Sequence, residues 1–286
     1  MEIRITTLNE NTAGRMGFLA EWGLSILVEA DGLKILLDTG YNISVVHNAS
    51  LLGIDLSTID KIVLSHGHCD HTGGLRQILV SRIGKGVEVI AHPDIWAPKF
   101  FVSPYYARRF EEGSYNYVGM LYQRGELEDL GASFNLTKDP VWITENMVTT
   151  GEIPMVTEHE KIDPGLYVRE EGGFRPDPLW DDRALVIKTK LGLVIVFGCG
   201  HRGLINTIYY AQELTGVEAI HTVIGGLHLC TASKEQLEFD ISKLKEFGTK
   251  KIRASHCTGM PAAMRLAQEF GDAFFFNNAG TRVTIP

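Results

Sequence analysis

The sequence lacks long hydrophobic runs, low-complexity stretches and an excess of positive charge. No apolar run is long enough to cross a bilayer, and the N-terminal MEIRITTLNEN has neither the basic start nor the apolar stretch of a signal peptide. The formal net charge of −8 argues against non-specific binding to nucleic acid or to an anionic membrane. We therefore expect a cytoplasmic protein that binds neither nucleic acid nor membrane.

Cysteine is also scarce, and the positions of the four cysteines argue against a disulfide framework. Cys69, Cys199 and Cys257 each lie within two residues of a histidine that is a candidate site residue, and Cys230 is the fourth. This pattern favours free thiols in a reducing compartment. The chain has 286 residues, of which 44% are hydrophobic and 22% charged, an ordinary balance for one large domain or two closely packed halves.

The sequence contains one plan twice. GLSILVEADGLKILLDTG (23–40) and ALVIKTKLGLVIVFGCG (184–200) both predict strand, turn, strand and then a break of small residues. The same alignment sets TIDKIVLSHGH (58–68) on EAIHTVIGGLH (218–228), so that a histidine ends both segments. In each half a further apolar strand also ends in histidine. Each half therefore predicts a β-hairpin, a helix, a strand, a helix and a strand.

This order of elements predicts a single α/β domain over residues 1–286. A sheet that carries helices on one face buries its other face best against a second sheet, which gives a four-layer αββα sandwich. The two similar halves would cover about 1–92 and about 136–286, with their histidines converging on one rim. Apolar residues at helical spacing predict helices at 43–53, 74–83, 203–215, 234–247 and 260–270.

The segment from about 93 to 135 has a different composition and predicts an inserted helical lid. Arg108 and Arg109 lie among its aromatic residues, so we expect it to bind a planar, phosphorylated small molecule. The alternative is that the aromatics form the segment's own small core or a contact between copies in a homo-oligomer. These aromatics are Trp96, Phe100, Phe101, Tyr105, Tyr106, Phe110, Tyr115, Tyr117 and Tyr122.

LSHGHCDHTGGL (64–75) places three histidines and an aspartate within six positions, directly after an apolar strand. His66 and His68 are two residues apart and can bind one ion from an extended backbone. Asp70 and His71 follow one turn later and can face a second ion. Imidazole and carboxylate ligands suit zinc, with iron or manganese as alternatives. The stretch therefore predicts a site for two divalent transition metal ions.

SHGHCDHTGG resembles the HxHxDH signature of the metallo-β-lactamase superfamily, and LLDTG, which contains Asp38, resembles that superfamily's support for the metal loop. The likeness extends over nearly the whole chain, and the superfamily's fold is the αββα sandwich. VFGCGHRGLINT, GGLHL, SHCTG and TGEIP resemble a narrower branch. This branch contains the 7,8-dihydropterin-6-methyl-4-(β-D-ribofuranosyl)aminobenzene-5′-phosphate synthases of the methanopterin pathway.

The resemblance implies further metal ligands in the second half of the chain. His256 matches the superfamily's last ligand, and Cys199 stands where the superfamily has a bridging Asp or Cys. The separate histidine of the superfamily's middle motif has no match here, and His201 is the candidate to replace it. Two interpretations of Cys199 stay open: a metal-bound thiolate, or a small buried cysteine behind the site.

The remaining polar candidates carry supporting roles. His228 is the candidate for stabilising charge on the substrate, and Asp70 for orienting the nucleophile. Glu152 and Asp182 are candidates to bind substrate or to orient ligands, and the alternative is that they are ordinary loop carboxylates. Among the other histidines, His92 is expected to cap a strand end, and the remaining three are expected to be structural or exposed; they are His47, His159 and His221.

These residues predict a metal-dependent hydrolase of a small-molecule ester or phosphoester, with a metal-bound hydroxide as nucleophile. The narrower resemblance implies an alternative, a transferase that joins a dihydropterin diphosphate to a ribofuranosylaminobenzene phosphate and releases pyrophosphate. A di-iron redox site is disfavoured because no flavin-binding or rubredoxin-like segment is attached. A non-catalytic, metal-bearing ligand sensor is the remaining alternative.

Overall fold

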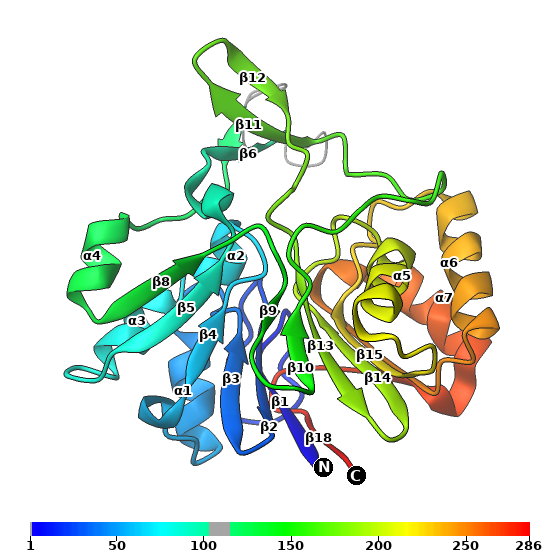
Figure 1. The fold of residues 1–286 in the computed structure, drawn as a ribbon, viewed down its shortest axis with the longest axis horizontal. Helices are drawn as coiled ribbons and strands as arrows, with labels where there is room; N and C mark the ends of the chain where they lie inside the picture. The colour runs from blue at the N-terminus through cyan, green and yellow to red at the C-terminus, as the bar shows by residue number, and fades with distance from the viewer. Residues whose placement is uncertain (1, 103–114) are drawn as a thin grey trace.

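The computed structural model describes residues 2–102 and 115–286, which form two seven-stranded sheets packed face to face with helices on both outer sides (Figure 1). The first sheet has the order β18 (Arg282–Ile285), β1 (Ile3–Asn9), β2 (Ser25–Ala30), β3 (Leu33–Leu37), β4 (Lys61–Val63), β5 (Val87–Ala91) and β8 (Ala132–Leu136). The second has the order β17 (Phe274–Phe276), β16 (Lys251–Ser255), β15 (Ile220–Gly226), β14 (Gly192–Phe197), β13 (Ala184–Thr189), β10 (Met147–Thr149) and β9 (Val141–Trp142). The predicted αββα sandwich is confirmed.

The five predicted helices are present, four with slightly shorter bounds and the last with the predicted bounds. They are α1 (Ser44–Leu51), α3 (Leu75–Val80), α5 (Leu204–Thr215), α6 (Lys234–Glu246) and α7 (Met260–Phe270). Two short helices, α2 (Cys69–Thr72) and α4 (Arg124–Asp129), accompany them, together with the 3-10 turns η1 (Leu56–Thr58), η2 (Pro93–Trp96), η3 (His256–Thr258) and η4 (Gly271–Ala273). In the part of the chain that is described, no helix is both long and apolar enough to cross a membrane.

Alternation along the strands explains the four layers. In β3, Ile35 and Leu37 face the second sheet, whereas Leu36 faces the helices on the outside. In β14, Val194 faces the first sheet and Ile195 faces the helices of the second half. Successive side chains of a strand point to opposite faces, so these strands are buried on both sides and are apolar throughout.

The two sheets repeat one connectivity, as the duplicated sequence predicts. The hairpin β2–β3 is followed by the parallel strands β4 and β5, and the hairpin β13–β14 by the parallel strands β15 and β16. The last strand of the second half, β18, joins the first sheet, where it pairs with β1. The carboxyl ends of parallel strands meet at one rim, and this rim carries the histidines.

The described part of the segment 93–135 is not the inserted helical lid that the sequence predicts. β6 (Lys99–Phe101) and β7 (Asn116–Tyr117) form a small third sheet with β11 (Leu166–Glu170) and β12 (Gly173–Pro176), which projects beyond the rim in Figure 1. α4 and β8 belong to the first half of the sandwich. The helical prediction was wrong here because β6 pairs with a strand more than sixty residues later in the sequence.

In the described part of this segment, Phe100 and Tyr115 pack against aromatic residues of β11 and β12, outside the segment itself. Tyr115 stacks on Phe174 of β12 with ring centroids 3.7 Å apart, and Phe100 meets the same ring at 4.9 Å. These contacts form the small core of the third sheet. Arg108 and Arg109, the predicted phosphate contacts, lie outside the described residues.

Candidate metal centre

The predicted ligands of the first half of the chain lie on α2 and on the tight loop between β4 and α2. His66 and His68 precede α2, with His68 on extended backbone, and Asp70 and His71 lie on α2 itself. Gly67 separates the two histidines, and a side chain there would come within 2.5 Å of a backbone oxygen of the chain that follows β5. The close packing therefore requires glycine and holds both imidazoles at the rim.

The second half contributes side chains from the ends of three neighbouring strands. Cys199 and His201 follow β14, His228 follows β15, and His256 follows β16. His228 and His256 have φ angles of 45° and 52°, in the left-handed region that side chains other than glycine rarely adopt. Strain of this kind is tolerated where the surroundings hold a side chain in place for function.

Six of the predicted ligands form two groups. His66, His68 and His201 place one donor atom each within 4.8 Å of one another, and so do Asp70, His71 and His256. In the first group, His66 Nε2 lies 3.0 Å from His68 Nδ1. In the second, His71 Nε2 lies 3.1 Å from His256 Nε2. Each group has three ligands of the types that bind zinc, iron or manganese.

Cys199 is buried next to the second group. Its Sγ lies 3.1 Å from His71 Nε2, and it also forms a set of three possible ligands with His66 and His71. Burial raises the pKa of this thiol well above its usual range in the absence of an ion. Since a bound metal deprotonates a coordinating thiol, this position suits a ligand shared by the two groups.

Asp38 supports both groups from below. It is fully buried, with a φ of 60°, and its Oδ2 lies 2.7 Å from His71 Nδ1. The same oxygen accepts a hydrogen bond from the Ser65 hydroxyl, whose oxygen lies 2.8 Å from His66 Nδ1. Gly198 allows this approach, because a Cβ there would lie 2.1 Å from the Ser65 hydroxyl oxygen. One carboxylate therefore orients a ligand in each group.

Other polar residues hold the ligands of the second half. The Nδ1 of His256 lies 3.0 Å from the amide oxygen of Asn11, and its backbone N–H donates to Glu10. Asp182, predicted to orient ligands, accepts from the backbone N–H of Arg202 and so fixes the turn after His201. Burial raises the pKa of Asp182 to about 7.

Burial and mutual repulsion keep most of these imidazoles neutral. Burial lowers the pKa of His66 and His201 well below the usual range and that of His68 to about 3. Burial also opposes the charged form of His71, but the charges of Asp38 and then Asp70 outweigh it and raise that pKa to about 9. Neutral imidazole is the form that binds metal.

Unpartnered atoms support the fit to a metal. Within the described residues, His68 Nε2 and both ring nitrogens of His201 are buried without a hydrogen-bond partner. A buried polar atom without a partner costs about 1–3 kcal/mol. An ion bound by these nitrogens would remove that cost, so the residues present fit a metal.

A buried ion cluster that sequence reasoning missed lies directly beneath the loop. Lys99 is 1% exposed, and its Nζ donates to Asp177 and Asp181 over 2.7 and 2.9 Å. Asp181 also accepts from the backbone N–H of Gly67, between the two histidines, over 2.8 Å. The adjacent acidic pair in WDDRALV was the available signal, but only its second member, Asp182, attracted a prediction.

A cavity of about 270 Å³ opens above the two groups. Its walls are largely apolar and include Trp22, Tyr41, Phe101 and Leu166. His228 also lines it, with its ring 4.0 Å from that of His201 and its Nε2 3.8 Å from an Asp163 oxygen. The four cysteines are all free and all lie on this cavity.

The other predicted residues lie away from the two ligand groups. Glu152 is hydrogen-bonded to His92 and forms an ion pair with Lys138. It is not among the residues that line the cavity, so the structure gives it no contact with the two ligand groups. His92 follows β5, and its side chain accepts a hydrogen bond from the backbone N–H of Asp94, so it caps the start of η2 rather than a strand end. The remaining three make unrelated contacts; they are His47, His159 and His221.

Replacing Cys199 with serine should weaken metal retention about tenfold or more, because its sulfur lies against both groups and a serine hydroxyl is a poorer ligand than a metal-bound thiolate. Cys230→Ser is the matched control, since Cys230 lines the same cavity but is exposed and belongs to none of the ligand sets found in the described residues. Elemental analysis after competition with a chelator measures both variants. Equal metal content would contradict a ligand role for Cys199.

Comparisons with known proteins find relatives along nearly the whole chain. Residues 23–168 match the family model described as the metallo-beta-lactamase superfamily. A Methanocaldococcus jannaschii protein named 7,8-dihydropterin-6-methyl-4-(beta-D-ribofuranosyl)-aminobenzene-5'-phosphate synthase is 36% identical, over 97% of this chain and 95% of that protein. An uncharacterized protein of the same organism, MJ0448, is 30% identical over 92% and 94% of the two chains.

Solved structures show the same fold. Tm1679, described as a metal-dependent hydrolase of the beta-lactamase superfamily, superposes with a TM-score of 0.82 and is 28% identical, over 98% of both chains. A diphosphatase from the PhnP family superposes with a TM-score of 0.55 at 13% identity, over 100% of this chain and 98% of that one. At that identity the likeness concerns the fold alone.

Proposed function

Because this chain belongs to the metallo-β-lactamase superfamily, we propose that its two ligand groups bind two divalent transition metal ions and that it is a metal-dependent pterin transferase. It would join a dihydropterin diphosphate to a ribofuranosylaminobenzene phosphate. The observation that carries this choice is the 36% identity to the synthase over almost the full length of both chains. Zinc is the first candidate metal, with iron and manganese as alternatives.

The reaction balances without a redox partner. The amine nitrogen of the aminobenzene forms a bond to the methylene carbon on the pterin ring, the bond from that carbon to the diphosphate oxygen breaks, and the amine loses one proton. Pyrophosphate leaves with the electron pair. Divalent ions at the two ligand groups would supply the positive charge that stabilises the leaving pyrophosphate.

The residues of the chain itself would orient the reactants and exclude water. The apolar walls of the 270 Å³ cavity, including Tyr41 and Leu166, shield the reacting carbon from hydrolysis. His228 faces the same cavity and would donate a hydrogen bond to an oxygen that gains charge, while Asp163 orients its ring. Asp38 and Ser65 hold the ligands in place before substrate binds.

A hydrolase is the second candidate, supported by the 28% identity to Tm1679 at a TM-score of 0.82. In that case water would be the nucleophile, oriented by Asp70, and the substrate would be a small ester or phosphoester. The two ligand groups by themselves would serve either the transfer or the hydrolysis, because both reactions need positive charge at a leaving oxygen.

Pyrophosphate release separates these functions. Metal-loaded protein is incubated with hydroxymethyldihydropterin diphosphate alone, with the aminobenzene substrate alone, and with both. Release that requires both substrates, with the coupled product detected by mass spectrometry, supports the transferase. Release from the diphosphate alone supports the hydrolase, and tight binding without turnover of any substrate supports a sensor.

A further inference from the structure

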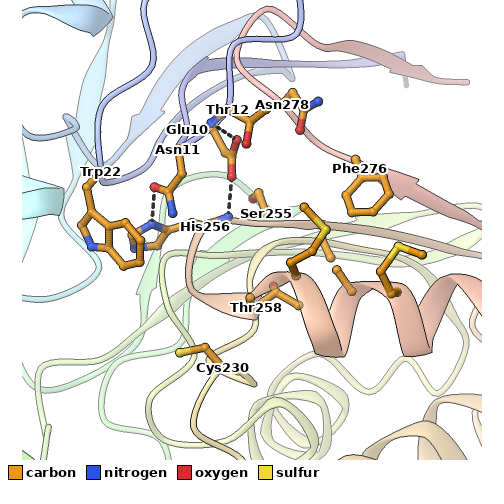
Figure 2. A pocket seen from close by; sticks show the side chains of 15 residues that line it. Glu10, Asn11, Thr12, Trp22, Cys230, Ser255, His256, Thr258, Phe276 and Asn278 are labelled. Carbon is orange, nitrogen blue, oxygen red and sulfur yellow. Dashed lines mark hydrogen bonds between the residues drawn. The ribbon is translucent and has the colours of Figure 1, made fainter. Parts of the chain in front are cut away.

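A second cavity, larger than the one above the ligand groups, lies on the other side of His256. It encloses about 480 Å³, within the range of small-molecule sites. Trp22, Cys230 and His256 line both cavities, so the two spaces adjoin at these three residues. Figure 2 shows Trp22 and Phe276 on opposite sides of the cavity, with Glu10, Thr12 and Asn278 above it.

We propose that this second cavity binds the ring of the dihydropterin substrate, with its methylene diphosphate extending past His256 to the metal groups. This assignment rests on the proposed function, which supplies the two candidate rings. The choice between them follows from the apolar walls, the polar groups, the charge and the position of the cavity.

The walls suit a flat, uncharged ring. Met260 and Met264 from α7 and Phe276 from β17 supply flexible thioethers and one aromatic face, and Trp22 supplies a second. These side chains are 63%, 48%, 42% and 60% exposed, although they are large and apolar. Exposed apolar side chains that gather around a cavity mark a binding site, and aromatic and thioether groups favour contact with ring systems.

Polar groups in the cavity suit a ring with hydrogen-bonding edges. Ser255 is 7% exposed, and within the described residues its hydroxyl is buried without a partner. Asn278 and Thr12 bring an amide and a second hydroxyl to the same space. A pterin ring carries N–H donors and carbonyl and ring-nitrogen acceptors along one edge, and such groups would satisfy a buried hydroxyl of this kind.

The charge of the cavity excludes a phosphate. No lysine or arginine lines it in the described part of the chain, and Glu10 contributes a carboxylate that already accepts from the backbone N–H groups of Thr12 and His256. The aminobenzene substrate carries a ribose phosphate opposite its amine. Its ring would therefore bring a dianion toward this carboxylate, and the desolvation would not be offset.

The position of the cavity favours the same ring. In the pterin substrate a single methylene separates the ring from the diphosphate, so ring and diphosphate must bind side by side. His256 meets this condition, because its Nε2 faces His71 in the ligand groups and its Nδ1 contacts Asn11, which lines the second cavity. Trp22 lies against the same imidazole, with ring centroids 5.5 Å apart.

Equilibrium binding of 6-hydroxymethyl-7,8-dihydropterin, which has the ring but no diphosphate, tests this assignment on the metal-loaded protein. Phe276→Ala should raise its dissociation constant about tenfold, because an aromatic contact is lost. Ser255→Ala should raise it about three- to tenfold. Phe275→Ala is the matched control, since Phe275 is the neighbour in β17, is 41% exposed and does not line the cavity. It should bind like the unchanged protein.

Met264→Glu adds a variant at an exposed position, where folding is least affected, and should weaken ring binding by more than tenfold. Thermal unfolding of each variant checks that the fold is intact. Unchanged ring affinity in Phe276→Ala, Ser255→Ala and Met264→Glu would overturn the assignment, as would weakened binding of the aminobenzene substrate in its place.

The same measurements separate this inference from the proposed function. If no pyrophosphate is released with both substrates, but the ring binds and the cavity variants weaken it, the site stands and the transfer reaction fails. If coupled product forms while the cavity variants change neither the ring affinity nor the Michaelis constant for the pterin diphosphate, the reaction stands and the site fails.

Discussion

Replacing both His66 and His68 with alanine is expected to remove metal from the purified protein and to abolish its turnover. These two imidazoles supply two of the three ligands in the first group, and His66 also lies against the second through His71, with ring centroids 4.2 Å apart. Two ligands cannot be replaced by water without losing most of the affinity, and the chemistry depends on the bound ions. We expect less than about a tenth of the original metal content, measured by elemental analysis of the dialysed protein.

The control for this variant is the double replacement of His47 and His159 by alanine. Both histidines are exposed and lie outside the ligand groups found in the described residues. Metal content and pyrophosphate release should stay within about twofold of the unchanged protein, because surface substitutions rarely disturb the fold. Stoichiometric metal retained by the His66 and His68 variant would refute the assignment of the first group.

Replacing Lys99 with methionine is expected to destabilise the protein by about 3–5 kcal/mol, measured as the free energy of unfolding in denaturant. The ammonium group of Lys99 is the partner of two buried carboxylates, Asp177 and Asp181. The methionine fills a similar volume but leaves both carboxylates without their counter-ion. The loop should also shift, because Asp181 holds the backbone of Gly67. Metal affinity should therefore fall about tenfold.

Lys61→Met is the control for Lys99→Met, because it removes the same positive charge from an ion pair that is partly exposed rather than buried. Lys61 pairs with Glu88, but the two side chains are 29% and 33% exposed, so water replaces much of the lost interaction. A pair of this kind contributes at most about 1 kcal/mol. If Lys99→Met cost no more than Lys61→Met, the buried cluster would not be what holds the loop.

The sequence alone was sufficient for the local parts of this protein. The hairpins, the parallel strands and the five main helices follow from apolar periodicity, which reports how each residue is buried within its own element. His66, His68, Asp70 and His71 are recognisable for the same reason, because a single strand, loop and short helix bring them together. The duplicated plan also predicts His228 at the rim, because it aligns His228 with His68.

Only the tertiary structure decided which distant segments meet. Asp38 and His71 are joined across 33 positions, and His71 and His256 across 185. The short strand β6 pairs with β11, so the described residues Lys99–Phe101 belong to a third sheet and not to the expected helical lid. No local pattern reports a pairing of this kind, since β-strand partners are chosen by packing rather than by neighbouring residues.

The sequence also does not show which charged residues are buried or where cavities form. Lys99 resembles an ordinary surface lysine in the sequence, and only the fold shows that it is buried against Asp177 and Asp181. The cavity beside His256 is formed by side chains from both ends of the chain, among them Trp22 and Phe276. Local sequence determined the ligands and the elements that carry them. The packing of the two halves decided how the ligands group, what holds them and where a substrate ring can bind, because these depend on distances between segments that the sequence order does not contain.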